Sequence, residues 1–437
     1  MPGWWRGGYM RKLSICLILC FFLAGCGLKE DAPVEEETEK VVLEYYTWQD
    51  EKDYAIRVVN HFMEENPGII VNMHFVPSSE YAQTISVIHN TRDSKIDVFA
   101  ETKPSNSAAD VERSFVLDIT DMYQRVPDMP EDYAELLDAL KINGRVYMLP
   151  YRKSTWAVYY NKNLFDQFGI PYPEGSWTWE DYTELAKELT RTIDGQKIYG
   201  SLSYETSSLW WRTPARTAGV ENQVTESGLE WLKKSALWNY RMSYEFQVQP
   251  AYTELTDVSS YDYINRFLAG NIGMFYCGDW CMEIIRRQLQ EKQLDFSYDV
   301  APIPMPAQAE GFMPVTTAVV QISSRTEHPE EALRLAEYIS GEEGAAIIAG
   351  CSVFPAWDTE EIREILKNSE HSPKHIEYFW DYNNPIYTSP DKEMEEALEI
   401  INTYVGRYFL KEISLEDAFS SIRSMLLERG LLSEDEK

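Results

Sequence analysis

Residues 41–76 read "VVLEYYTWQDEKDYAIRVVNHFMEENPGIIVNMHFV", and this stretch decides the fold. Its first eight residues, 41–48, are mostly β-branched or aromatic and predict a strand, as do residues 69–76. The apolar residues between these two segments recur at helical spacing and stop at Pro67. The stretch therefore predicts a strand–helix–strand unit at the start of an α/β domain.

The same alternation continues to residue 101. Residues 79–92, "SEYAQTISVIHNTR", predict a second helix, and residues 95–101, "KIDVFAE", predict a third strand. Such a run implies a mostly parallel sheet with helices on both faces, whose ligands lie beyond the carboxyl ends of the strands. Those ends are Thr47–Trp48 and Glu101–Thr102.

The remaining chain predicts a second lobe. Residues 178–247 are largely helical, with Thr178 as the N-cap of one helix, and strands reappear in "IGMFYC" and "PVTTAVVQIS". We therefore expect an α/β protein with two lobes, mixed sheets flanked by helices, and a ligand cleft that closes by hinge motion. The expected division is lobe 1 at residues 41–150 and 312–352, and lobe 2 at residues 151–311 and 353–437.

The N-terminus carries a predicted export signal. A basic start is followed by the apolar run Leu13–Leu23, which at 11 residues is too short to span a membrane. The run ends in Leu-Ala-Gly-Cys, similar to a bacterial lipobox, which predicts cleavage after residue 25 and lipid on Cys26. The acidic segment 26–40 is expected to be a disordered tether. The alternative is an ordinary signal peptide with a chance cysteine.

The amino-acid composition limits the classes of partner that the protein can be expected to bind. The formal charge of −31 argues against nucleic acid and against broad docking on anionic lipid. Aromatic residues make up 13% of the chain, which suits a cleft that stacks on sugar rings. The six cysteines show neither a zinc-site spacing nor a disulfide framework.

No familiar catalytic motif is present, so the sequence favours a binding protein over an enzyme. His371 and His375 have a ligand-like spacing, but Pro373 between them prevents a regular helical pair. Carboxylate pairs of the glycosidase type remain open, because 71 acidic residues make any single pair uninformative. We expect neither a cofactor nor a metal.

Several segments together resemble the extracellular solute-binding proteins of bacterial ABC importers, the sugar-binding family that includes maltose-binding protein. The segments follow the family's order: "GRVYMLPY", "AVYYNKNLFDQFGIPYPEGSWTWEDYTELAKELT" (157–190), "FLAGNIGMFYCGDW" (267–280), "APIPMP", "ISSRTEHPEEALRLAEYISGEEGA" and "GCSVFPAW". Two positions depart from the pattern: Gly273 replaces the usual Ala, and Thr316–Thr317 replace a common Gly pair in a hinge strand.

The resemblance implies a periplasmic-binding-protein-like fold of type II and a monomeric, extracytoplasmic receptor on a lipid anchor. Its expected partners are a sugar or oligosaccharide and the permease subunits of an ABC transporter, with no nucleic acid and no membrane contact beyond the lipid. Two alternatives stay open: a tethered carbohydrate-active enzyme, and a ligand receptor that feeds a membrane sensor.

Sugar recognition needs aromatic rings for the C–H faces and planar polar groups for the hydroxyls. Candidate residues come from the strand ends, from the two crossings between lobes, from a Trp pair in the helical lobe and from the family-like Gly-Asp-Trp turn. The resulting candidates are Trp48, Glu101, Tyr151, Arg152, Trp210, Trp211, Asp279, Trp280 and Trp357.

Overall fold

A computed structural model describes residues 40–91, 95–102, 104–124, 129–203, 209–218, 223–255, 260–307, 311–382, 385–387 and 390–433. Residues 40–437 form one compact unit. The predicted signal peptide, Cys26 and the tether up to residue 39 lie outside the described residues. Within the described ranges, no helix combines the length and the apolar character that crossing a membrane requires.

The opening stretch forms two parallel strands of the first sheet, as predicted, and the second of them lies at the sheet edge. The first two strands are parallel and in register from the Val41–Ile69 pair to the Trp48–Val76 pair, and the third strand joins the first in parallel. The full order is β11-β10-β3-β1-β2, with β4 also paired to β10. The strands are β1 (Val41–Trp48), β2 (Ile69–Val76), β3 (Val98–Glu101), β4 (Met148–Ser154), β10 (Met313–Ile322) and β11 (Pro385–Tyr387).

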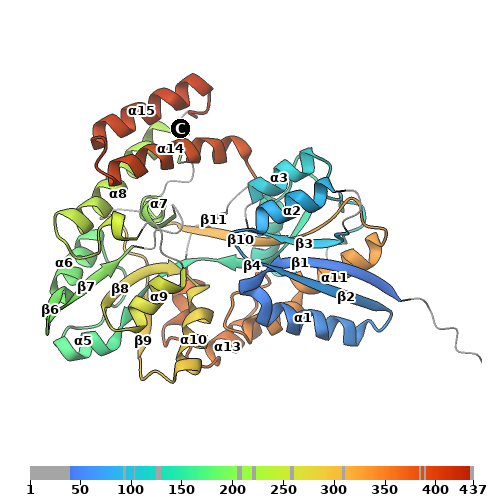
Figure 1. The fold of residues 1–437 in the computed structure, drawn as a ribbon, viewed down its shortest axis with the longest axis horizontal. Coiled ribbons are helices and arrows are strands. Elements are labelled where there is room, and N and C mark those ends of the chain that lie inside the picture. The colour runs from blue at the N-terminus through green and yellow to red at the C-terminus, as the bar shows by residue number, and fades with distance from the viewer. Residues whose placement is uncertain are drawn as a thin grey trace, which may run out of the picture. The chain divides into compact units, whose positions relative to one another are not determined.

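Helices cover both faces of this sheet, as Figure 1 shows. One face is covered by α1 and α11, and the other by α2 and α3. The apolar side of α1 is buried through Val58, Val59 and Phe62, which places the core between helix and sheet. The helices of this lobe are α1 (Lys52–Glu65), α2 (Tyr81–Asn90), α3 (Pro104–Glu112), α4 (Glu131–Ala139), α11 (Pro329–Ser340) and α12 (Glu342–Ala349).

The second sheet has the order β6-β7-β8-β5-β9 and mixes parallel with antiparallel pairs. Thr178 caps α6 in a reciprocal capping box with Asp181, which confirms the predicted N-cap. The strands are β5 (Trp156–Asn161), β6 (Arg191–Ile193), β7 (Gln196–Leu202), β8 (Ile272–Gly278) and β9 (Tyr298–Ala301). The helices are α5 (Lys162–Phe168), α6 (Trp179–Leu189), α7 (Leu209–Arg216), α8 (Glu226–Tyr244), α9 (Ser260–Leu268) and α10 (Cys281–Lys292).

The C-terminal part of the chain contacts both lobes. α14 (Lys392–Phe409) contacts α3 of the first lobe, while α15 (Leu415–Arg429) contacts α8 of the second. α13 (Glu360–Lys367) lies against α12. The short 3₁₀ segment η3 (Ile376–Phe379) contacts β5 and β9.

Two expected lobe boundaries do not coincide with the sheets. The expected boundary at residues 150 and 151 falls inside β4, because the long strand β10 offers β4 partners as far as Ser154. Residues 353–437 were expected in lobe 2 throughout, yet β11 pairs in parallel with β10 of the first sheet. The chain therefore crosses between the sheets directly after Ser154.

Candidate ligand-binding site

The site is built where the first crossing meets the end of β8. Trp156 of β5 pairs with Gly278 of β8, and the Asp279 amide donates to the Thr155 carbonyl at 3.0 Å. These backbone bonds fix the turn from β8 into α10 beside the strand that leaves the first sheet. Arg152 and Gly278 thereby lie at the same junction, although they are 126 positions apart in the sequence.

Glu51 organises the first-lobe side of this junction. It belongs to the 3₁₀ turn η1 (Gln49–Glu51), which follows directly after β1, and its side chain is buried. One carboxylate oxygen accepts from Tyr151 Oη at 2.7 Å and Thr47 Oγ1 at 2.8 Å. The other accepts from Arg152 Nη1 at 2.7 Å, and Arg152 also donates to Tyr54 Oη at 3.2 Å. The arrangement holds the guanidinium in one orientation through charge-assisted bonds.

Asp279 lies on the second-lobe side and is 0% exposed. Burial raises the pKa of its carboxyl to about 6, although nearby Arg152 and Ser154 act in the opposite direction. Neither carboxylate oxygen has a hydrogen-bond partner of good geometry among the described residues, and the same holds for Arg152 Nε. A buried acceptor and a buried donor at one junction thus retain unused hydrogen-bonding capacity, which points to a ligand.

Trp280 covers this turn. Its indole folds back over Gly278, so closely that a Cβ added to that glycine would lie 2.2 Å from Trp280 Nε1. The residue is half-buried and stands directly before α10. Gly278 is therefore required for the indole to take this position, directly after the buried Asp279 in the chain.

Trp48 and Glu101 lie at the predicted strand ends. The Trp48 ring packs against Tyr81 with centroids 4.5 Å apart and is 7% exposed. Glu101 accepts from the Thr102 amide at 2.7 Å and from Asn106 Nδ2 at 3.2 Å, so its carboxylate holds the start of α3. This placement favours a structural role for Glu101 and leaves Trp48 near the edge of the core.

Trp357 lies at the second crossing, beside β4. Pro355 forms a bridge with Arg152, and the Ala356 amide donates to the Tyr151 carbonyl at 3.0 Å. The Trp357 ring packs on Tyr133 at 5.1 Å, and its buried Nε1 has no acceptor among the described residues. Trp357 therefore remains a candidate donor to a hydroxyl group.

Trp210 and Trp211 pack against the C-terminal part of the chain. Both rings are 3% exposed and pack on Phe409 of α14, at 5.0 Å and 6.4 Å between centroids. Trp210 also approaches Tyr252. These contacts indicate packing of the C-terminal helix, so we do not include either ring in the site proposed below.

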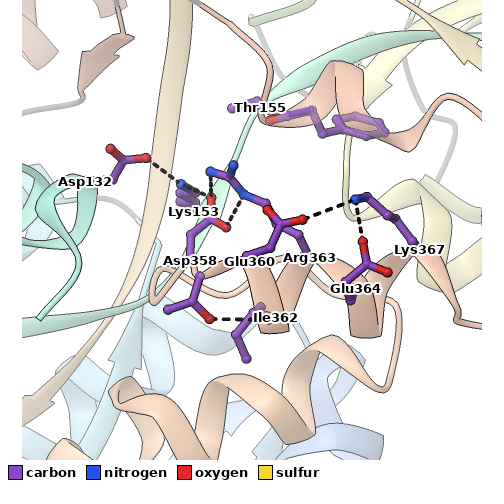
Figure 2. A network of polar contacts seen from close by, with 11 residues as sticks. Asp132, Lys153, Thr155, Asp358, Glu360, Ile362, Arg363, Glu364 and Lys367 are labelled. Atoms are coloured by element: carbon purple, nitrogen blue, oxygen red, sulfur yellow. Dashed lines mark hydrogen bonds and ion pairs between the residues drawn. The ribbon is translucent and has the colours of Figure 1, made fainter. Parts of the chain in front are cut away.

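A second polar network clamps the two crossings together, as Figure 2 shows. Lys153 of β4 pairs with Asp358 at 2.6 Å, and both side chains are 6% exposed. Arg363 donates to both oxygens of Asp358, at 2.7 and 3.1 Å, while Asp132 lies 3.5 Å from Lys153. The ion pairs hold the pKa of Asp358 below its usual value, against the effect of its burial.

Sequence reasoning missed the residues that hold the site in place. Glu51, Tyr54, Lys153 and Asp358 were not candidates, although Glu51 follows the predicted strand end at Trp48 by three residues.

A surface hollow of about 600 Å³ against α12 and α13 contains none of the predicted residues. Its lining residues are Gly350, Glu361, Glu364, Ile365, Asn368, Ser369 and Glu370.

Fold and site geometry together define a two-lobed binding protein, and comparison with known proteins gives its family. Residues 46–346 match the model of the bacterial extracellular solute-binding protein family, and the chain belongs to this family. Membership places the protein outside the cytoplasm.

Curated relatives and solved structures agree with this assignment. A putative binding protein of Brucella abortus is 24% identical over 345 residues, covering 77% of each chain. The multiple sugar-binding protein of Streptococcus mutans is 24% identical over 178 residues, covering 40% of each chain. A sugar transporter from Rhizobium etli in an open conformation superposes with a TM-score of 0.75 at 21% identity, covering 88% of this chain and 98% of the other. An ABC substrate-binding protein from Listeria monocytogenes in complex with cycloalternan gives 0.72 at 19% identity, with 90% and 99% covered. The similarity to these structures confirms the predicted fold.

Proposed function

We propose that this protein is a lipid-anchored receptor that binds a sugar or oligosaccharide reversibly and delivers it to an ABC importer. The carrying observation is the Asp279–Arg152 junction beside the Trp280 indole, where a buried carboxylate and a buried guanidinium nitrogen have no hydrogen bond of good geometry with the described residues. Sugar hydroxyls both donate and accept hydrogen bonds, so one ligand can donate to the Asp279 carboxylate and accept from the Arg152 guanidinium. The indole face suits the C–H face of a sugar ring.

The junction also supports recognition coupled to closure. Arg152 is held by Glu51 of the first lobe, while Asp279 and Trp280 belong to the second. Arg287 of α10 approaches Asp53 of α1 at 4.0 Å, which forms an ion pair between the lobes. A ligand that contacts both sides favours the closed state by the contacts made only there. Similarity to a multiple sugar-binding protein and to a sugar transporter supports a sugar as the ligand.

A thermal screen of residues 40–437 tests this function. Mono- and oligosaccharides are added one at a time, and the unfolding temperature is recorded with and without each compound. A ligand at about 100 times its dissociation constant stabilises the protein by roughly 2.7 kcal/mol. We expect an upshift with at least one saccharide and full recovery of that saccharide afterwards. Upshifts with peptides alone would contradict the sugar proposal, and hydrolysis of the saccharide would favour the tethered enzyme.

The lipid anchor is tested separately. The full chain and a Cys26→Ser variant are expressed in a bacterial host, and cell fractions are probed for the protein. We expect wild type in the membrane fraction and the variant in the soluble extracytoplasmic fraction. Equal membrane association of both would contradict lipidation at Cys26.

An uptake measurement separates an importer receptor from a sensor. Loss of saccharide uptake on deletion of the protein would favour an importer receptor over a sensor.

A further inference from the structure

Two cysteines bracket the Gly278–Asp279–Trp280 turn. Cys277 is near the end of β8, and Cys281 is the first residue of α10. Their Sγ atoms lie 2.9 Å apart, and both side chains are 0% exposed. Cys351, the third cysteine in the described ranges, is also buried and follows α12 in the chain.

The surroundings of this thiol pair do not suggest a metal site. A structural metal site needs three or four convergent ligands. The described residues contain no group of three or more His, Cys, Asp or Glu side chains that fits a metal ion. Two thiols in direct contact, in a protein whose family works outside the cytoplasm, instead match the conditions under which disulfides form and persist.

We propose that Cys277 and Cys281 form a disulfide in the exported protein, and that this bond holds the Asp279–Trp280 turn in its ligand-binding geometry. The first part rests on the thiol contact and the compartment. The second part rests also on the function proposed above.

The oxidation requires an external disulfide, either a small-molecule disulfide or that of a thiol–disulfide oxidoreductase. One cysteine thiolate attacks it, forming a mixed disulfide and releasing one external thiol. The second cysteine thiolate then displaces the other external thiol, so two electrons and two protons pass to the external pair. Burial raises the pKa of both thiols, which slows this exchange once the protein has folded. We therefore expect the bond to form during folding, before β8 and α10 pack.

The effect of the bond is local. The closed ring spans only residues 277–281, and a short loop removes little entropy from the unfolded chain. The turn already has two anchors: Tyr159 Oη donates to the Gly278 carbonyl at 2.9 Å, and the Asp279 amide donates to Thr155. A covalent link across the turn adds a third, which restricts Asp279 and Trp280 in the absence of ligand and lowers the cost of binding.

Peptide mapping of the full, exported chain tests bond formation. The protein is purified without reductant, denatured with N-ethylmaleimide and digested with trypsin. Residues 267–286 form one tryptic peptide that holds both cysteines. We expect this peptide to be unlabelled and lighter by two hydrogen atoms, and to take two labels after reduction. Cys351 serves as the internal control and takes one label under both conditions. Two labels on the 267–286 peptide without prior reduction would overturn the proposal.

A binding measurement tests the second part. With a saccharide from the thermal screen, we expect reduction to weaken binding by wild type about tenfold. A Cys277→Ser/Cys281→Ser variant should bind as weakly as the reduced protein and be insensitive to reductant, while Cys351→Ser should behave as wild type. Equal affinity of oxidised and reduced wild type would overturn the positioning role. If no saccharide binds at all, the proposed function fails, and the peptide map still decides whether the bond exists.

Discussion

Arg152 Nη1 lies 2.7 Å from Glu51 Oε1, and this ion pair joins the end of the first β-strand to the strand at which the chain leaves the first sheet. The two side chains are only 13% and 6% exposed. In a pair this well buried, the charge-assisted hydrogen bond balances the charge of Arg152 and also restricts the orientation of its guanidinium. The guanidinium is therefore oriented before any ligand arrives.

Removing Glu51 should destabilise the first lobe. In Glu51→Ala the buried Arg152 loses its ionic partner, and Tyr151 and Thr47 lose their acceptor. Breaking a buried pair from one side costs about 3 kcal/mol or more. Urea unfolding of residues 40–437 measures the loss. Glu64→Gln, at an exposed position of α1, should change the free energy of unfolding by less than about 0.5 kcal/mol. Similar values for both variants would contradict the assigned role of Glu51.

The Lys153–Asp358 pair should show strong energetic coupling. Among the described residues, Asp358→Ala leaves the buried ammonium of Lys153 with only Asp132 as an ionic partner, at 3.5 Å, so we expect a loss of about 3 kcal/mol. Adding Lys153→Met to the Asp358→Ala variant should lower the free energy of unfolding little further. A double-mutant cycle should give a coupling energy of about 2 kcal/mol. Lys367→Met removes a partly exposed pair and serves as the control. Additive effects of Lys153→Met and Asp358→Ala would show that the clamp does not act as a unit.

Asp279 should lower the stability of the ligand-free protein at neutral pH. Its folded-state pKa of about 6 lies above the ordinary carboxyl value, so the folded protein holds a proton that the unfolded chain releases. The stabilising contribution of protonated Asp279 is therefore complete below about pH 4 and is lost as the pH rises through about 6. Asp279→Asn should remove this loss and raise the free energy of unfolding near neutral pH by roughly 3 kcal/mol. Urea unfolding as a function of pH measures it, and parallel curves for the two proteins would contradict the prediction.

Gly278 should not tolerate a methyl group. Gly278→Ala places a carbon 2.2 Å from Trp280 Nε1, so the indole must leave its position over the turn. We expect lower stability, by about 1–3 kcal/mol, because the added carbon overpacks the site. Gly406→Ala is the matched control, since nothing lies within 4 Å of its added carbon and alanine favours the α14 helix. Equal effects of the two substitutions in thermal unfolding would contradict the packing described here.

Local sequence patterns predicted most of the fold. The alternation of strand-forming and helix-forming segments over residues 41–101 predicted the parallel strands β1, β2 and β3 and the helices between them. These features depend on neighbours in the sequence. β11 is only three residues long, and its pairing with β10 depends on contacts that no local pattern reports.

The site was only partly predictable for the same reason. Asp279 and Trp280 stood out because they follow a strand in a family-like turn. Glu51 meets Arg152 across 101 positions of sequence, so the network that orients the guanidinium could not be read from either segment alone. Trp210 and Trp211 were candidates as an adjacent aromatic pair in the helical lobe, and their packing on Phe409 of α14 is a contact that no local pattern reports.

The most direct test of sugar binding at this junction is calorimetric titration of a saccharide from the screen into wild type and Asp279→Asn. We expect one site in wild type and an affinity about 10- to 100-fold lower in the variant, because a charged acceptor contributes roughly 1.5–3 kcal/mol to a hydrogen bond. The variant should at the same time be more stable than wild type without ligand. Equal affinity in the two proteins would contradict the claim that the sugar binds at the Arg152–Asp279 junction.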